Sequence, residues 1–202
     1  MSRPPPREVR IVGGRWKRTR LPVADKPGLR PTPDRVRETL FNWLGQSLDG
    51  WRCVDAFAGT GALGFEAASR GAADVLLVEQ DAELVAQLRA IQKKLSAETV
   101  RIQRGNGLTV LAGLEAASTD LILLDPPFDA DLFDKALSAA APALAEAGFV
   151  YLEAPAAWTA ERLALHGLSL WRHARAGSVH AHLLRGHNAP QQTAPGADRI
   201  RP

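Results

Sequence analysis

One tetrapeptide in the sequence combines residue types that suit chemistry on an aromatic amine. Asp125-Pro126-Pro127-Phe128 follows the apolar run 121–124, which is typical of a buried strand. The two prolines fix φ and lack N–H donors, so the carbonyl groups beside the carboxylate are held rigidly. Carboxylate and carbonyl can accept both hydrogens of an exocyclic base amine, and Phe128 offers a face on which an extruded base can stack. We therefore predict Asp125, Pro126, Pro127 and Phe128 as catalytic residues that act on the amino group of a nucleic-acid base.

Asp125 has two other possible roles, a metal ligand or a plain strand-end turn. A metal site needs further ligands at suitable spacing. His180-x-His182 offers two imidazoles on one strand face, and we interpret this pair as structural or solvent-facing. We therefore expect no metal cofactor.

A glycine-rich segment follows the first apolar run that begins after residue 51. Gly59, Gly61 and Gly64 match the G-x-G-x-x-G pattern, and Glu79 stands twenty residues after Gly59, where it could accept hydrogen bonds from ribose hydroxyls. Such a loop brings a ligand close to backbone N–H groups at the start of a helix. This geometry serves the pyrophosphate of a nicotinamide or flavin cofactor, and equally the methionine carboxylate of S-adenosylmethionine.

Asp55, four residues before the first glycine, favours S-adenosylmethionine. A carboxylate there would repel pyrophosphate, but it can hold a positively charged amino group, directly or through water. Asp-x-Phe-x-Gly-x-Gly resembles the first motif of class I methyltransferases, and Asn106-Gly107 lies where such enzymes place residues beside the adenine, although Asn-Gly is also an ordinary turn. We expect S-adenosylmethionine, with S-adenosylhomocysteine as its product, to bind to Asp55, Phe57, Gly59, Thr60, Gly61, Glu79, Asn106 and Gly107.

The elements that position these residues alternate regularly along the chain. Apolar runs lie at 53–57, 75–78, 100–102, 121–124 and 149–152, and helix-compatible stretches lie near 61–70, 81–95, 107–115 and 130–145. This alternation predicts an α/β fold, with helices on both faces of a mostly parallel sheet. The runs 168–175 and 179–184 predict a C-terminal antiparallel hairpin. We expect a Rossmann-like class I methyltransferase domain with a seven-stranded sheet over residues 32–186.

The N-terminal region carries most of the positive charge. Residues 1–37 hold eleven Lys/Arg against three Asp/Glu, whereas the remaining residues hold fourteen against nineteen. Runs 9–12 and 15–21 around Gly13-Gly14 predict a two-residue hairpin, and Thr32 is expected to cap a helix that begins at Pro33. A basic arm over residues 1–31 that contacts RNA phosphates is our interpretation, and a solvated tail is the alternative.

The residues predicted to bind RNA are basic or aromatic positions of this arm and of the following helix. Trp16 is expected either to stack on RNA or to pack under the hairpin. The predicted set is Arg10, Arg15, Trp16, Lys17, Arg18, Arg20, Arg30, Arg35 and Arg37.

Length and composition restrict the remaining possibilities. The 202 residues suit one domain with an appendage, and no run of eighteen apolar residues is present, so we expect no membrane association. Cys53 is the only cysteine, and residues 1–10 lack the apolar segment of a signal peptide. We therefore expect a cytoplasmic monomer, with residues 187–202 as a disordered tail.

The chain resembles the bacterial 16S rRNA guanine-N2 methyltransferases of the RsmD type. The resemblance rests on the Arg-Ile-Val-Gly-Gly-Arg-Trp-Lys stretch from Arg10, the segment 29–44 with its Arg-Pro-Thr-Pro-Asp-Arg-Val-Arg-Glu sequence, residues 55–70, Glu79, 125–128 and Tyr151-Leu152-Glu153. It extends to about residue 186. It implies methyl transfer to N2 of one guanine in 16S rRNA, with the assembled small ribosomal subunit as substrate. One departure is the Arg18-Thr19 pair after Lys17, because family members often have a glycine there.

Two other functions stay open at this point. An N6-adenine DNA methyltransferase shares the Asp-Pro-Pro-aromatic motif, but it normally carries a separate target-recognition region, and only about fifty residues precede the first strand of the domain. A non-catalytic ribosome-assembly factor could retain the fold, but the glycine loop and Asp125–Phe128 are intact.

Overall fold

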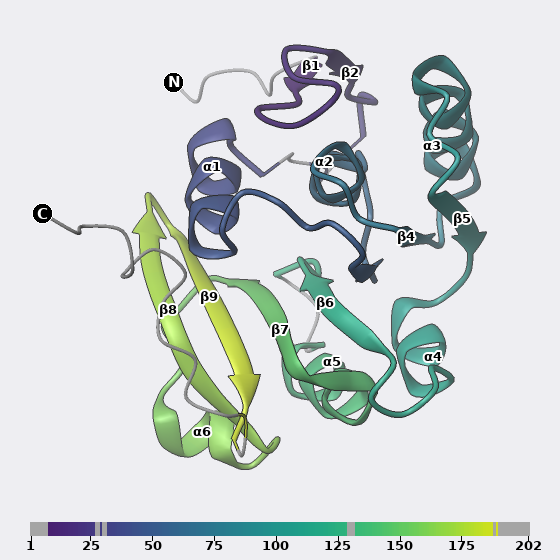
Figure 1. The fold of residues 1–202 in the computed structure, drawn as a ribbon. Helices are drawn as coiled ribbons and strands as arrows, with labels where there is room; N and C mark the ends of the chain where they lie inside the picture. The colour runs from purple at the N-terminus through teal and green to yellow at the C-terminus, as the bar shows by residue number, and fades with distance from the viewer. Residues whose placement is uncertain (1–7, 27–28, 30–31, 129–131, 188, 190–202) are drawn as a thin grey trace, which may run out of the picture.

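The computed structural model describes residues 8–26, 29, 32–128, 132–187 and 189. Its centre is a seven-stranded sheet with the order β5-β4-β3-β6-β7-β9-β8 (Figure 1). The strands β3 to β7 pair in parallel, whereas β9 is antiparallel to both β7 and β8. This sheet confirms the predicted class I methyltransferase architecture. Its strands are β3 (Arg52–Asp55), β4 (Asp74–Glu79), β5 (Val100–Arg104), β6 (Thr119–Leu124), β7 (Leu144–Ala154), β8 (Leu168–Ala176) and β9 (Val179–Gly186).

Helices cover both faces of the sheet (Figure 1). One face packs against α1 (Asp34–Trp43), α2 (Ala62–Ser69) and α3 (Ala82–Leu95), and the other against α4 (Gly107–Ala112), α5 (Phe133–Ala140) and α6 (Ala160–Ala164). Successive strand residues point to opposite faces. Leu77 and Leu123 accordingly belong to the first core, and Val78 and Leu124 belong to the second.

Side-chain caps fix where two of the helices begin. The Asp81 carboxylate accepts hydrogen bonds from the backbone N–H groups of Glu83 and Leu84 at the start of α3. The Asn106 side chain does the same for Leu108 and Thr109 at the start of α4. Both caps satisfy N–H groups that have no partner inside the helix. They therefore determine the position of each helix N-terminus at the carboxyl end of the preceding strand.

The N-terminal hairpin differs from the predicted two-residue turn. The strands β1 (Glu8–Arg10) and β2 (Arg20–Pro22) pair antiparallel, and the whole segment 11–19 connects them. The segment is long because it docks on the end of α2: the Arg15 N–H donates to the Ser69 carbonyl, and the Ser69 hydroxyl donates to the Gly13 carbonyl. Val9, Ile11 and Leu21 are part of the first hydrophobic core. The described part of the arm is therefore packed onto the domain.

Two boundary predictions were also wrong. Helix α1 begins at Asp34 with Pro33 at the cap position, and no side chain caps it. The Thr32 hydroxyl instead donates to the Asp125 carboxylate. Strand β7 begins at Leu144, within the stretch that was predicted to be helical up to residue 145, because α5 ends at Ala140 and a 3₁₀ turn (Ala141–Ala143) follows. The predicted disordered tail, 187–202, lies almost entirely outside the described residues.

Candidate active site

The strand order reverses between β3 and β6, and acidic residues gather at the carboxyl ends of the central strands. Asp55 ends β3, Glu79 ends β4, Asp125 follows β6 and Glu153 lies near the end of β7. The register places Leu124 beside Leu152, so Asp125 and Glu153 are the next residues along two adjacent strands. In open α/β sheets, ligands bind in the crevice at such a reversal. The sequence prediction of a site at this edge is consistent with this arrangement.

The glycine loop turns tightly from β3 into α2. Gly59 and Gly61 have positive φ angles of 50° and 76°, and Gly61 occupies the cap position of α2. A Cβ atom on Gly61 would lie 2.6 Å from the Leu88 side chain, so only glycine fits there. A side chain at Gly107 would collide with the Ala56 carbonyl. Glycine therefore allows the start of α4 to pack directly against the chain that enters the loop.

Asp55 is a buried carboxylate with one satisfied oxygen. Its Oδ2 atom accepts a hydrogen bond of 3.1 Å from the Gly64 N–H in the first turn of α2, whereas Oδ1 has no partner among the described residues. Burial raises the pKa of this carboxyl to about 7, although the hydrogen bond from the Gly64 N–H lowers it. An ammonium group would satisfy the second oxygen and favour the ionised form. The residue therefore suits the amino group of a methionine moiety.

Glu79 stabilises the glycine loop through a hydrogen bond to its backbone. Its Oε2 atom accepts a hydrogen bond of 2.9 Å from the Gly59 N–H, and Oε1 accepts one of 2.8 Å from the Asp81 N–H. Each carboxylate oxygen can accept a further hydrogen bond, so the side chain is held in one orientation and can still bind a diol. Thr60 is buried, and its hydroxyl accepts from the Ala62 N–H, which is a local structural role.

The Asp125 carboxylate lies among other polar side chains. Its Oδ2 atom is 3.5 Å from the Thr32 hydroxyl, which donates to it. Removal from water raises the pKa of this carboxyl well above its usual range, and the nearby Glu153 and Asp55 charges add to the shift. The residue retains some exposure to solvent, although protein atoms surround its carboxyl group.

Phe128 lies at the surface just beyond this carboxylate. Its side chain is 41% exposed, and its ring centroid is 6.1 Å from that of Phe133, which in turn lies 6.4 Å from the buried Trp158. Pro126 is buried and Pro127 is exposed. An aromatic face that is supported from behind and open in front is available to a flat ring.

The prediction that Arg37 binds RNA was wrong. Its side chain is fully buried, and its guanidinium donates to Glu66 at 2.9 Å, to Asp34 at 2.6 Å and to the carbonyl groups of Arg10 and Thr32. These partners use the donors of the guanidinium fork, so no phosphate can reach it. Its spacing along a basic segment suggested a solvent-facing residue, but α1 turns this position toward α2.

The other basic residues predicted to bind RNA lie at the surface wherever the structure describes them. Arg10 pairs with Asp34, and Arg20 pairs with Glu8. Arg30 lies outside the described residues. The remaining predicted basic RNA contacts, Arg15, Lys17, Arg18 and Arg35, are exposed.

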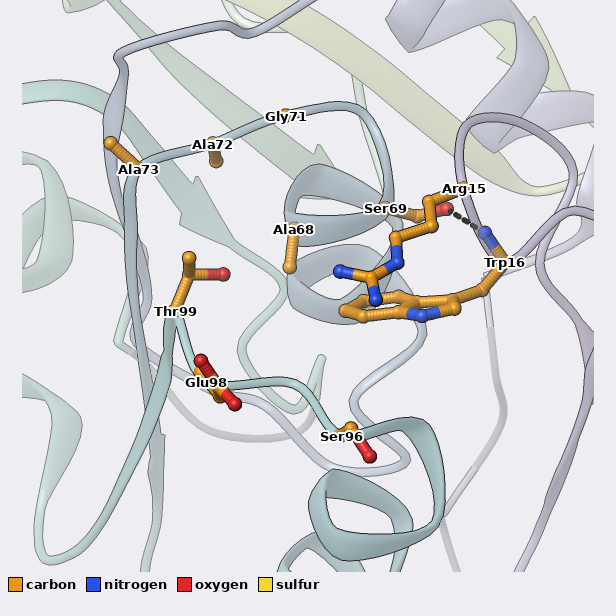
Figure 2. Close-up of a pocket in the computed structure, with 10 residues that line it drawn as sticks. All are labelled: Arg15, Trp16, Ala68, Ser69, Gly71, Ala72, Ala73, Ser96, Glu98 and Thr99. Atoms are coloured by element: carbon orange, nitrogen blue, oxygen red, sulfur yellow. Dashed lines mark hydrogen bonds between the residues drawn. The ribbon is translucent and has the colours of Figure 1, made fainter.

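Trp16 lies partly buried against the first core, beside an open cavity of about 350 Å³ (Figure 2). The Arg15 guanidinium lies over the Trp16 ring at 5.9 Å from its centroid. The backbone N–H of Trp16 donates a hydrogen bond to the Ser69 hydroxyl. The opposite wall contains Ser96 and Glu98. Trp16 therefore packs under the hairpin with one part of its ring and leaves another part open to solvent.

This cavity is distant from the carboxylates. The cavity lies at the C-terminal end of α2, whereas the glycine loop lies at its N-terminal end. The eight residues of the helix separate the two by about 12 Å.

The sequence interpretation missed the network around Asp125 and around Glu66. Glu153 directly follows the predicted apolar run 149–152, and the pairing of β6 with β7 places it beside Asp125, so the end of that run was the available signal. Tyr151 donates a hydrogen bond of 3.0 Å to Glu153. No comparable signal pointed to Thr32, because its contact with Asp125 joins residues 93 positions apart.

The histidine pair is split between the buried His182 and the half-buried His180. The Trp158 N–H donates to Nε2 of the buried His182, and Nδ1 of His182 lies 3.3 Å from the Leu152 carbonyl. Burial lowers the pKa of His182 to about 4. Across the described ranges, no group of three or more His, Cys, Asp or Glu side chains is placed to hold a metal ion. Nor does any helix in that part of the chain have the length and apolarity to cross a membrane.

Comparisons with known proteins agree with this geometry. Residues 9–185 match the family described as Conserved hypothetical protein 95. Ribosomal RNA small subunit methyltransferase D of Escherichia coli is 38% identical over 176 residues, which cover 82% of this chain and 88% of that protein. The protein of the same name from Haemophilus influenzae is 42% identical over 134 residues, 65% of this chain and 69% of its own. The solved structure of yhhF, a proposed methyltransferase from Escherichia coli, is 34% identical, covers 89% of this chain and 98% of its own, and superposes with a TM-score of 0.76. The chain therefore belongs to the ribosomal RNA small subunit methyltransferase D family.

Proposed function

We propose that this protein transfers the methyl group of S-adenosylmethionine to the exocyclic N2 amine of a guanine in 16S rRNA, within the small ribosomal subunit. The observation that carries the proposal is the position of Asp125. Its carboxylate lies at the reversal of the strand order and near Asp55, which precedes the glycine loop, and the exposed Phe128 follows three residues later. Family membership supports the same reaction class.

The carboxyl ends of β3, β4 and β5 would hold the cofactor. Asp55 would bind the methionine amino group through its unpartnered oxygen, and Glu79 would bind the ribose hydroxyls. The N–H groups at the start of α2 would meet the methionine carboxylate. The remaining predicted cofactor contacts lie in the loops that follow β3 and β5 and would line the cofactor there: Phe57, Gly59, Thr60, Gly61, Asn106 and Gly107. When bound, the cofactor supplies an electrophilic methyl group on its sulfonium.

Asp125 would act directly on the base. Its carboxylate accepts a hydrogen bond from the N2 amine, which favours the pyramidal nitrogen whose lone pair attacks the methyl group. Stabilising charge that develops in a transition state is worth ~2.7–4 kcal/mol per group. Phe128 would stack on the extruded guanine, which contributes ~1–3 kcal/mol. Pro126 and Pro127 would hold both groups in place.

The exposed arm would contact rRNA away from the methylated base. Arg15, Lys17, Arg18 and Trp16 form a basic and aromatic surface at the far end of α2. Backbone phosphates bind such surfaces without regard to sequence. About 12 Å of helix separates this surface from the glycine loop, so the substrate has to reach both ends of α2.

The test is a labelling experiment with substrate classes compared side by side. The protein is incubated with methyl-labelled S-adenosylmethionine and with unmethylated small subunits, protein-free 16S rRNA or duplex DNA, and the products are digested to nucleosides. We expect the label in N2-methylguanosine, mostly from assembled subunits. Label in N6-methyladenine, or in DNA, would contradict the proposal in favour of the adenine methyltransferases that share the Asp-Pro-Pro-aromatic motif.

A further inference from the structure

Thr32 brings the N-terminal segment into contact with the proposed catalytic carboxylate. Its side chain is 4% exposed, and its hydroxyl lies 3.5 Å from Asp125 Oδ2. The Thr32 carbonyl accepts a hydrogen bond of 3.2 Å from the buried Arg37 guanidinium, which fixes the backbone at this position. Helix α1 begins two residues later without a side-chain cap. The backbone of Thr32 therefore serves the fold, and its hydroxyl is directed to Asp125.

Glu153 approaches the same carboxylate from β7. It is buried, and its Oε1 atom accepts a hydrogen bond of 3.0 Å from the Tyr151 hydroxyl. Burial raises the pKa of Glu153, whereas Thr32, Tyr151 and the Arg37 charge lower it. The Tyr151 hydroxyl therefore holds Glu153 in place, next to a residue that has to accept a hydrogen bond from substrate.

We propose that Thr32 and Glu153 are positioning residues for Asp125, and this rests on the proposed function. The Thr32 hydroxyl holds one oxygen of Asp125 and so turns the other toward the base amine. The Glu153 carboxylate, fixed by Tyr151, places a negative charge beside Asp125 that opposes its ionisation. The N-terminal segment thereby completes the site that the strand ends build.

The two residues act on Asp125 in opposite directions. A donor stabilises the ionised carboxylate, whereas a neighbouring negative charge favours the protonated form. The groups that face Asp125 are Asp55 at the end of β3, Glu153 and Tyr151 on β7, and the Thr32 hydroxyl. Burial, Glu153 and Asp55 raise the pKa of Asp125, in that order, and Thr32 lowers it. The ionised carboxylate is the stronger acceptor for the amine, so activity falls as the pH falls through this pKa.

The experiment is the pH dependence of single-turnover methylation between about pH 5.5 and 9. The variants Thr32→Val and Glu153→Gln are compared with wild type on assembled subunits. Thr32→Val is expected to move the acidic limb to higher pH, because Asp125 loses its donor. It should also lower the plateau rate about five- to tenfold, which corresponds to one hydrogen bond. Glu153→Gln is expected to move the acidic limb to lower pH, because a neighbouring charge is lost.

Three controls separate positioning from folding. Thr32→Ser retains the hydroxyl and should restore the wild-type profile. Tyr151→Phe removes the hydroxyl that donates to Glu153, so Glu153 ionises less readily. The acidic limb should then move to lower pH, as in Glu153→Gln. Affinity for S-adenosylhomocysteine should stay within about twofold of wild type in Thr32→Val.

The outcomes are distinct. Opposite shifts with rescue by serine support the proposal. If Thr32→Val and Glu153→Gln shift the acidic limb in the same direction, or if the profile of Thr32→Val matches that of wild type, the proposal is overturned. A wild-type protein that does not methylate any guanine overturns the proposed function instead.

Discussion

Replacing Glu66 with alanine should destabilise the protein by removing the centre of a buried polar network. The Glu66 carboxylate has no exposure to solvent. It accepts hydrogen bonds from Arg37 Nη1 at 2.9 Å and from Arg70 Nε at 3.0 Å. The backbone N–H groups of Val12 and Gly13 donate to it at 2.8 Å and 2.7 Å. It therefore joins α1, α2 and the N-terminal segment.

The expected magnitude follows from what the substitution leaves behind. Two guanidinium groups that are almost fully buried would lose their shared anion, and two backbone N–H groups would lose their acceptor. Breaking a buried ion pair from one side costs about 3–5 kcal/mol, because the remaining charge is uncompensated. For a chain of about 200 residues each kcal/mol corresponds to about 2–4 °C, so the melting temperature should fall by roughly 6–20 °C.

Urea unfolding followed by circular dichroism measures this change. The exposed Glu38, on α1, provides the matched control, and Glu38→Ala should stay within about 0.5 kcal/mol of wild type. The double variant Arg37→Met with Glu66→Ala should lose less than the sum of the single variants, because the second substitution removes the uncompensated charge. A loss below about 1 kcal/mol for Glu66→Ala would show that the network does not hold the hairpin.

Three further predictions concern the cofactor cradle and the arm. Glu79→Ala should weaken S-adenosylhomocysteine binding by about ten- to a hundredfold in calorimetry, because each charge-assisted hydrogen bond contributes ~1.5–3 kcal/mol; unchanged affinity would refute the ribose assignment. Asp55→Asn should stabilise the free protein by an amount that grows as the pH rises from 3.8 to about 7, since the folded pKa is raised above its ordinary value and ionisation opposes folding there. Urea unfolding at both ends of that range checks it, and a gain that does not depend on pH would count against it. Replacing the exposed arm residues Arg15, Lys17 and Arg18 with alanine should lower the slope of log RNA affinity against log salt concentration by up to ~0.7–0.9 per residue. Cofactor affinity should not change. A slope equal to that of wild type would exclude these residues as RNA contacts.

The repeated strand and helix pattern made the domain predictable from the sequence. Continuous apolar runs bounded by glycine-rich turns appear wherever a parallel strand is buried on both faces, and the predicted strands and helices are all present. The acids at the strand ends were predictable for the same reason, because parallel strands bring their carboxyl ends to one edge. Local pattern and tertiary packing agree in this part of the chain.

The N-terminal segment was less predictable, because long-range contacts decide its structure. Arg37 and Arg35 belong to the same basic run, but one is buried in an ion-pair network and the other faces solvent. Gly13-Gly14 indicated a short hairpin, but docking on Ser69 opens it into a longer connection. Thr32 was expected to cap a helix, and its hydroxyl contacts Asp125 instead. The contacts that decide these three cases are made with Glu66, Ser69 and Asp125, which lie far away in the sequence, so no local pattern records them.

Single-turnover methylation of assembled small subunits by Asp125→Ala tests the central claim most directly, with calorimetric binding of S-adenosylhomocysteine as the control. Loss of transition-state stabilisation should lower the rate about a hundred- to a thousandfold, while cofactor affinity and the melting temperature stay close to wild type. Asp125→Asn retains an acceptor oxygen and should keep more activity than alanine, because the proton can leave after methyl transfer. If Asp125→Ala methylates within a few-fold of wild type, the carboxylate is only a structural strand end and the proposed mechanism is contradicted.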